Sequence, residues 1–79
     1  MKRRKFIVNV SASEIALYRS MKFALNSAIR ESERLIREHA RAVGDVFEGG
    51  APRRSGDVYA REWFNANERL QVTIQPASE

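Results

Sequence analysis

The sequence contains no cysteine, and among its 79 residues it has only two prolines and four glycines. Without cysteine the chain forms no disulfide and no cysteine-ligated metal site. A protein of this composition can function in a reducing compartment. It also lacks an apolar run long enough to cross a bilayer, and the apolar residues 6–10 are too few for the core of a signal peptide. We therefore expect an intracellular, soluble protein without a membrane partner.

Positive charge is in excess, because fourteen Lys and Arg face ten Asp and Glu, for a formal net charge of +4. Part of the excess lies in a basic N-terminal segment, residues 2–5, which consists of Lys2, Arg3, Arg4 and Lys5. Such a cluster favours phosphate backbones, anionic membranes or acidic protein surfaces. A single small domain over residues 1–79 buries only about 60% of the surface of its unfolded chain, so contacts with a partner would help a marginal core.

The first half of the chain predicts a strand and a long helix. Residues 6–10 are rich in β-branched and aromatic side chains, which is typical of a short strand. Ser11 and Glu14 have the spacing of a capping box, in which each side chain satisfies a backbone donor at a helix N-terminus. Apolar residues then recur three or four positions apart, which predicts an amphipathic helix over 13–46.

The second half predicts a loop and a hairpin. Gly and Pro residues indicate a loop over 47–57, and residues 58–76 form a β-hairpin around a turn at residues 65–68. The expected fold class is therefore α+β, with a short N-terminal strand, a long amphipathic helix and a C-terminal β-hairpin. A continuous helix of about 32 residues would be roughly 48 Å long, more than its own sheet could cover. A break near Asn26 and Ser27 would give two helices instead.

Arginines gather within an arc of about 60° on the polar side of the expected helix. The members of this stripe are Arg19, Arg30, Arg34, Arg37 and Arg41. They are either a solvated face held by pairs such as Glu33–Arg37 and Arg34–Glu38, or a contact surface for nucleic acid or an acidic neighbour. Phe23 falls on the same arc, which indicates a covering partner or a break in the helix.

The residue pattern predicts no catalysis, no metal and no cofactor. His39 is the only histidine and has no cysteine to share a metal, so we interpret it as a structural or surface residue. Gly49, Gly50 and Gly56 lack the spacing and the Lys-Ser/Thr ending of a phosphate-binding loop. We predict a protein that is not an enzyme.

Two adjacent aromatics, Trp63 and Phe64, point to opposite faces of their predicted strand. One of them enters the core, and the other is exposed unless the domain covers it. Because Trp, Tyr and Arg dominate binding hot spots, Trp63 beside Arg61 is a candidate interface residue.

The segment "RKFIVNVSASEIALYRSM" resembles the ribbon-helix-helix DNA-binding proteins, with a basic start, an alternating strand and a capped helix. In that family the strands of two subunits pair and enter the major groove. The resemblance implies a dimeric DNA-binding regulator in which Lys5, Ile7 and Asn9 face the bases.

A second resemblance rests on Ala51, Pro52, Ser55 and Gly56, followed by the hydrophobic Val58. A long helix, a loop of this form and then β structure are similar to the tail-completion or head–tail joining proteins of long-tailed phages. The resemblance implies a structural assembly protein that acts through homo-oligomeric contacts in a ring at the phage neck. Its partners would be identical subunits and neighbouring phage proteins, in the host cytoplasm or in the virion.

Between the motif residues lie Arg53 and Arg54, which are either loop charges in solvent or contacts to an acidic neighbour or to passing DNA. A third function, which composition alone does not separate from the first two, is inhibition of a host protein by a small basic binder. Salt dependence separates nucleic-acid binding from the other two functions, because phosphate contacts weaken steeply as salt rises. Recovery of one stoichiometric partner from the host would indicate the inhibitor.

Overall fold

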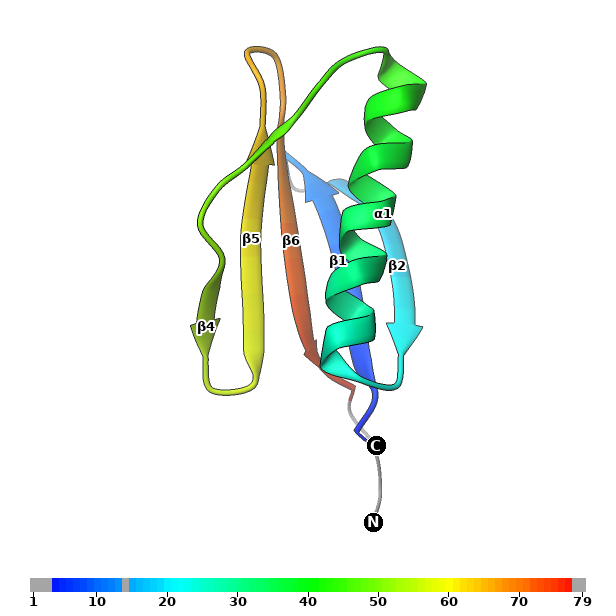
Figure 1. Cartoon of the computed structure of the whole chain (residues 1–79), viewed down its shortest axis with the longest axis vertical. Coiled ribbons are helices and arrows are strands. Elements are labelled where there is room, and N and C mark those ends of the chain that lie inside the picture. The colour runs from blue at the N-terminus through cyan, green and yellow to red at the C-terminus, as the bar shows by residue number, and fades with distance from the viewer. Residues whose placement is uncertain (1–3, 14, 78–79) are drawn as a thin grey trace.

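The computed structural model describes residues 4–13 and 15–77 and contains one antiparallel sheet with a single helix on one of its faces (Figure 1). The elements in chain order are β1 (Phe6–Ala12), β2 (Ile15–Lys22), α1 (Leu25–Val43), β3 (Glu48–Gly49), β4 (Arg53–Ser55), β5 (Val58–Phe64) and β6 (Arg69–Pro76). The strand order is β2-β1-β6-β5-β3, and β4 pairs with a second part of β5. The N-terminal strand β1 therefore lies inside the sheet, next to the last strand β6.

The core lies between α1 and the covered side of the sheet, which we call the helix face. Val8 and Val10 of β1 pair with Ile74 and Val72 of β6, and all four side chains are fully buried. The residues of α1 that complete the core are Ala28, Ser32, Leu35 and Ile36. The uncovered side of the sheet, which we call the open face, carries the polar residues that alternate with this apolar row.

The predicted helix start at Ser11 is wrong. Strand β1 continues to Ala12, Ser13 turns the chain with a positive φ of 48°, and β2 returns antiparallel to β1. The other half of the expected capping box, Glu14, lies outside the described residues. Residues 15–22 are thus a strand. The range 13–46 contains neither one long helix nor two helices, but a strand followed by the shorter helix α1.

The apolar residues of β2 have a helical period in the sequence although they lie on a strand. The register with β1 shifts between Val10 and Ser11, which interrupts the alternation of faces before Tyr18, whereas Tyr18–Lys22 pair regularly. Pairing with β1 satisfies the backbone groups on one side of β2 and outweighs the helix propensity of Ala, Leu, Met and Lys in this segment.

Helix α1 has 19 residues and a length of about 28 Å, which its own sheet can match. It ends at Gly44, which has a left-handed φ of 70° and donates its backbone N–H to the Ala40 carbonyl. The expectation that the helix is too long for its own sheet to cover is therefore wrong. The fold is strand-rich, with six strands in one sheet among the described residues, and not a short strand followed by a long helix.

The segment predicted as a loop, 47–57, contains the two short strands β3 and β4 along the outer edge of β5. The C-terminal hairpin forms at the positions that the sequence indicated. Its turn is closed by Asn65, whose Oδ1 accepts the backbone N–H groups of Asn67 and Glu68, each at 2.8 Å. These edge strands and the hairpin position the arginines described next.

Candidate nucleic-acid interface

A groove separates α1 from the outer strand of the sheet. Helix α1 packs over β1, β2 and β6 and leaves the helix face of β5 beside it. The groove has a volume of about 370 Å³. Apolar lining comes from Ile36, Phe47 and Trp63, and the charged side chains at its borders are Glu33, Arg37, Arg41 and Asp45.

Arg61 and Trp63 lie side by side on the helix face of β5, where they pair with the buried Val72 and Leu70. The guanidinium carbon of Arg61 lies 4.4 Å from the centroid of the Trp63 ring, a cation–π contact. Residues two apart on a strand share a face, so the sequence pattern Arg-x-Trp favours this stack.

Three further contacts hold the Arg61 side chain in place. Its Nε–H donates to the Gly50 carbonyl at 2.7 Å, and a terminal nitrogen lies 3.7 Å from the Glu33 carboxylate of α1. Gly49 lies against the stack, because a Cβ built on it would be 2.5 Å from Arg61 and 2.9 Å from Trp63. Arg61 therefore connects α1, β5 and the chain that leads to β4.

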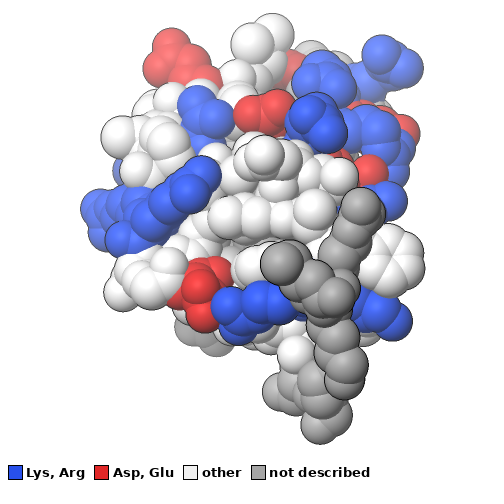
Figure 2. All heavy atoms as spheres, turned by 60° about the horizontal axis from the view of Figure 1, so that its bottom comes forward, with Lys and Arg blue, Asp and Glu red and all other residues white. Residues whose placement is uncertain are grey.

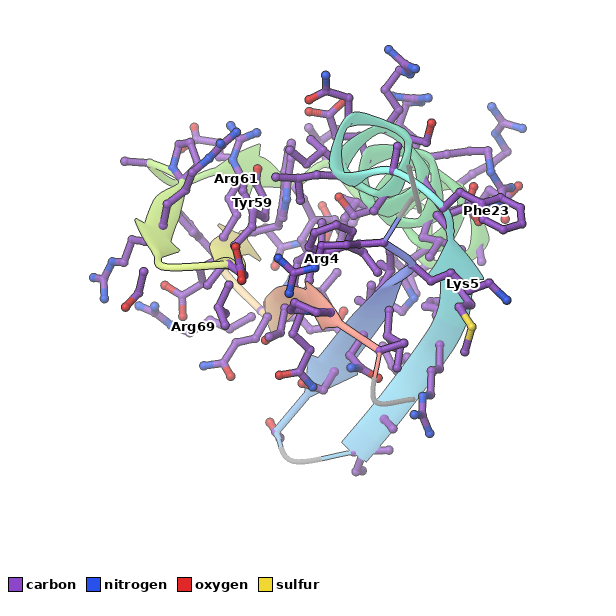
Figure 3. The ribbon with its side chains drawn as sticks, turned by 90° about the horizontal axis from the view of Figure 1, so that it is seen from below. Arg4, Lys5, Phe23, Tyr59, Arg61 and Arg69 are labelled. Atoms are coloured by element: carbon purple, nitrogen blue, oxygen red, sulfur yellow. The ribbon has the colours of Figure 1, made fainter. Side chains whose placement is uncertain are left out.

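The lower end of the molecule continues this arrangement (Figure 3). Arg54 of β4 lies 5.9 Å from the ring of its cross-strand partner Tyr59, which is buried. Arg4 binds Asp57 at 2.8 Å. Figure 3 shows Arg4, Tyr59 and Arg61 on the side of the sheet that carries the helix, with Arg69 on the opposite side.

Helix α1 adds three arginines from its outer surface. Arg30, Arg37 and Arg41 lie within about 40° of one another on the helix, next to the Glu33 flank. All three are exposed, and among residues 4–13 and 15–77 none has a carboxylate within 4.0 Å. We call the set on this side of the molecule the arginine face; it consists of Arg30, Arg37, Arg41, Arg54 and Arg61.

The surface reflects this distribution. Figure 2 shows Lys and Arg side chains to both sides of a strip of uncharged residues at the lower end of the molecule. Fewer Asp and Glu side chains are visible on this face. Cations to both sides of a shallow strip create a positive potential that attracts a polyanion.

Arg34, which the sequence placed in the same stripe of arginines, is neutralised by two glutamates of its own helix. It donates to Glu31 at 2.7 Å and also binds Glu38, so the predicted Arg34–Glu38 pair forms, whereas Glu33 binds Arg61 and not Arg37. Hydrogen bonds from Arg34 hold the pKa of the Glu31 carboxyl below its ordinary value of 4.5; burial opposes this shift and Lys22 adds to it. The same Glu31 hydrogen bonds raise the pKa of Arg34.

Other predicted candidates lie elsewhere. Arg53 faces the open side of the sheet, opposite Ala60, and Phe23 lies in the connection between β2 and α1, with Lys5 5.4 Å from its ring. Arg19 lies on β2 and not on the helix. The loop residues Pro52, Ser55 and Gly56 are all exposed around β4, while Lys2 and Arg3 lie outside the described residues.

The docking implied by ribbon-helix-helix proteins is not available in this fold. That mode needs a free edge on the N-terminal strand, but β1 is paired with β2 on one side and β6 on the other. Ile7, one of the expected base-reading residues, is only 8% exposed. A nucleic acid would have to bind elsewhere on the molecule.

Comparison of the chain with protein-family models, curated proteins and solved structures gave no match. The chemistry of its side chains therefore carries the functional argument. Within the described residues no group of three or more His, Asp or Glu side chains is placed to hold a metal ion, and no helix is long and apolar enough to span a membrane. His39 packs between Tyr18 and Phe47 and lies 3.2 Å from a Glu68 oxygen, which is a structural environment.

Proposed function

We propose that the protein is a non-enzymatic nucleic-acid-binding protein that holds the phosphate backbone on its arginine face. The observation that supports this proposal is a group of arginines without carboxylate partners on one side of the molecule. Four members of the arginine face, Arg30, Arg37, Arg41 and Arg54, have no carboxylate partner among the described residues. The fifth member, Arg61, lies 3.7 Å from Glu33. Outside this set Arg34 and Arg69 bind glutamates, whereas Arg19 on β2 and Arg53 on the open face have no carboxylate partner among the described residues.

Contact with phosphates is favoured over stacking on bases. Proteins that stack bases offer free aromatic faces beside a basic groove. Here Trp63 already has Arg61 over its ring, Tyr59 has Arg54, and Phe64 has Arg69 at 5.9 Å. The arginines retain N–H groups that can donate to phosphate oxygens, which is the contact that fixes position without reading sequence.

The test is the salt dependence of affinity for a fluorescein-labelled DNA duplex of about 20 base pairs, followed by fluorescence anisotropy. If all five arginines contact phosphates, the slope of log K against log salt is about −4.5. Little dependence on duplex sequence is expected. Affinity that does not change with salt, or no binding at low salt, contradicts the proposal.

A matched pair of variants tests the location of the site. Arg37→Gln removes one charge from the arginine face and is expected to reduce the slope by about one unit. Arg69→Gln removes one charge from the other side of the sheet and is expected to leave the slope unchanged. Both residues are exposed, so circular dichroism should show the same folded state for both variants. Equal effects of the two substitutions would mean that only net charge matters.

Head–tail joining by a homo-oligomeric phage protein is a second proposal, which rests on the exposed arm around β4. Residues 51–57 are all exposed, and the motif residues Pro52, Ser55 and Gly56 precede the start of β5 at Val58. An exposed arm can contact the adjacent subunit of a closed ring. Light scattering at high salt tests it: a mass of many subunits without DNA supports the ring, and a monomer or dimer contradicts it.

A further inference from the structure

Strand β2 forms an unprotected edge of the sheet. It has eight residues, and within the described part of the chain it pairs with β1 on one side only. At the opposite edge, β5 is followed by β3 and β4, two short strands separated by a segment that contains Pro52. Short strands and proline hinder further pairing, whereas a long free strand offers its N–H and C=O groups to another chain.

The same edge exposes large apolar side chains. Ile15 and Met21 of β2 are 64% and 56% exposed, and Phe23 next to the strand is 61% exposed. Only two other large apolar side chains of the described residues, Val43 and Val46, are at least 50% exposed. Free backbone groups and apolar side chains along one edge are the features of an interface formed by strand addition.

We infer that β2 pairs with β2 of a second copy of this chain, antiparallel and about a two-fold axis at Ser20. The register shift of β2 lies before Tyr18, so Tyr18–Lys22 is its regular part and Ser20 is the centre of that part. In this register Arg19 lies opposite Met21 of the second copy, and Tyr18 lies opposite Lys22 of the second copy. A register centred on Arg19 would instead place two arginines face to face.

Self-complementary cross-strand pairs favour a second copy as the occupant. The charged residues of β2 are the cations Arg19 and Lys22, and the two-fold register places neither of them opposite another cation. The glutamates of the nearby helix flank, Glu31 and Glu38, are already bound by Arg34 of the same copy. Tyr18 contacts His39, which follows Glu38 in α1. Two-fold pairing brings Lys22 of each copy opposite the Tyr18 ring of the other, where a cation–π contact can form. Isologous contacts of this kind close at two subunits.

The experiment uses the absence of native cysteine. In Ser20→Cys the two thiols lie at a cross-strand pair on the axis, where Cα atoms are about 5 Å apart, a distance that suits a disulfide. We expect oxidation to give a covalent dimer at least about tenfold faster than in the control Ser55→Cys, because pairing raises the effective thiol concentration. Equal rates for both variants would overturn the two-fold register.

Mass measurements on the unmodified chain, without nucleic acid, test the pairing itself. Sedimentation should give a dimer that dissociates on dilution. Met21→Lys places a second cation opposite Arg19 and should shift the protein to monomer, whereas Val46→Lys, at an even more exposed position, should leave the dimer intact. A monomer at all concentrations, an assembly larger than a dimer, or equal effects of the two lysines would overturn the inference. None of these outcomes depends on nucleic-acid binding.

Discussion

The guanidinium of Arg61 lies 4.4 Å from the centre of the Trp63 ring, and this pair joins the edge strands to the helix. The pair does so because Arg61 also donates to the Gly50 carbonyl and approaches Glu33 of α1. Five cation–π contacts occur among residues 4–13 and 15–77, and four of them involve arginine. Arginine–aromatic packing is thus part of what stabilises the fold as well as its proposed site.

Gly49→Ala should destabilise the protein, because the added Cβ would lie 2.5 Å from Arg61 and 2.9 Å from Trp63. We expect a loss of about 1–3 kcal/mol in the free energy of unfolding, measured with urea. In an Arg61→Ala background the same substitution meets fewer atoms and should cost less. Additive losses in the double variant would show that Gly49 does not act through the Arg61 stack.

Glu31 should contribute stability that disappears in acid. Its folded pKa is lowered, so its contribution is fully present above the unfolded pKa and is lost as pH falls through the folded value, below 4.5. Glu31→Gln should therefore lower the free energy of unfolding by about 0.5–1 kcal/mol at neutral pH. Near pH 3, where the carboxylate of the parent protein is increasingly protonated, we expect this difference to shrink. A difference that is constant with pH would rule out the ion pair as its cause; Glu48→Gln, at an exposed position, is the control.

His39 should stabilise mainly through its ring. It contacts Tyr18 and Phe47, and its side chain is only 12% exposed. His39→Ala should cost about 2 kcal/mol of unfolding free energy by leaving a cavity. His39→Phe keeps the ring contacts and should retain most of the stability. If both variants lose the same amount, the contact with Glu68 is the dominant interaction.

Local alternation was sufficient to predict the strands at the centre of the sheet. Val8, Val10, Val72 and Ile74 fall on the buried side as their spacing indicates, because one face of each strand must meet the core. The helix start was not predictable in this way. Residues 15–22 carry helix-forming side chains, and only pairing with β1, which is a tertiary interaction, makes them a strand.

The candidate site was predicted in part for the same reason. Arg30, Arg37 and Arg41 share a surface because they fall within the part of the predicted helix that forms. The i, i+4 spacing did not separate Arg34 from the other arginines, because the Arg34–Glu38 pair forms but the equally spaced Glu33–Arg37 pair does not. The contributions of Arg54 and Arg61 depend on strand pairing and on the approach of Gly49 and Gly50, for which the sequence carries only the Arg-x-Trp spacing.

Strand β6 comes last in the chain but lies in the interior of the sheet. The ribosome synthesises β6 after the other strands, yet β6 lies between β1 and β5 in the sheet. Val8 of β1 therefore has no cross-strand partner on that side until Ile74 of β6 has been synthesised. Until then the nascent chain exposes the free side of β1 and an apolar row without its cover, which is a state prone to aggregation. Pairing of β1 with β6 also slows folding, because these strands are far apart in the sequence. The long segment between them must lose entropy before the two strands can gain contacts. The sheet is therefore completed only after β6 has been synthesised.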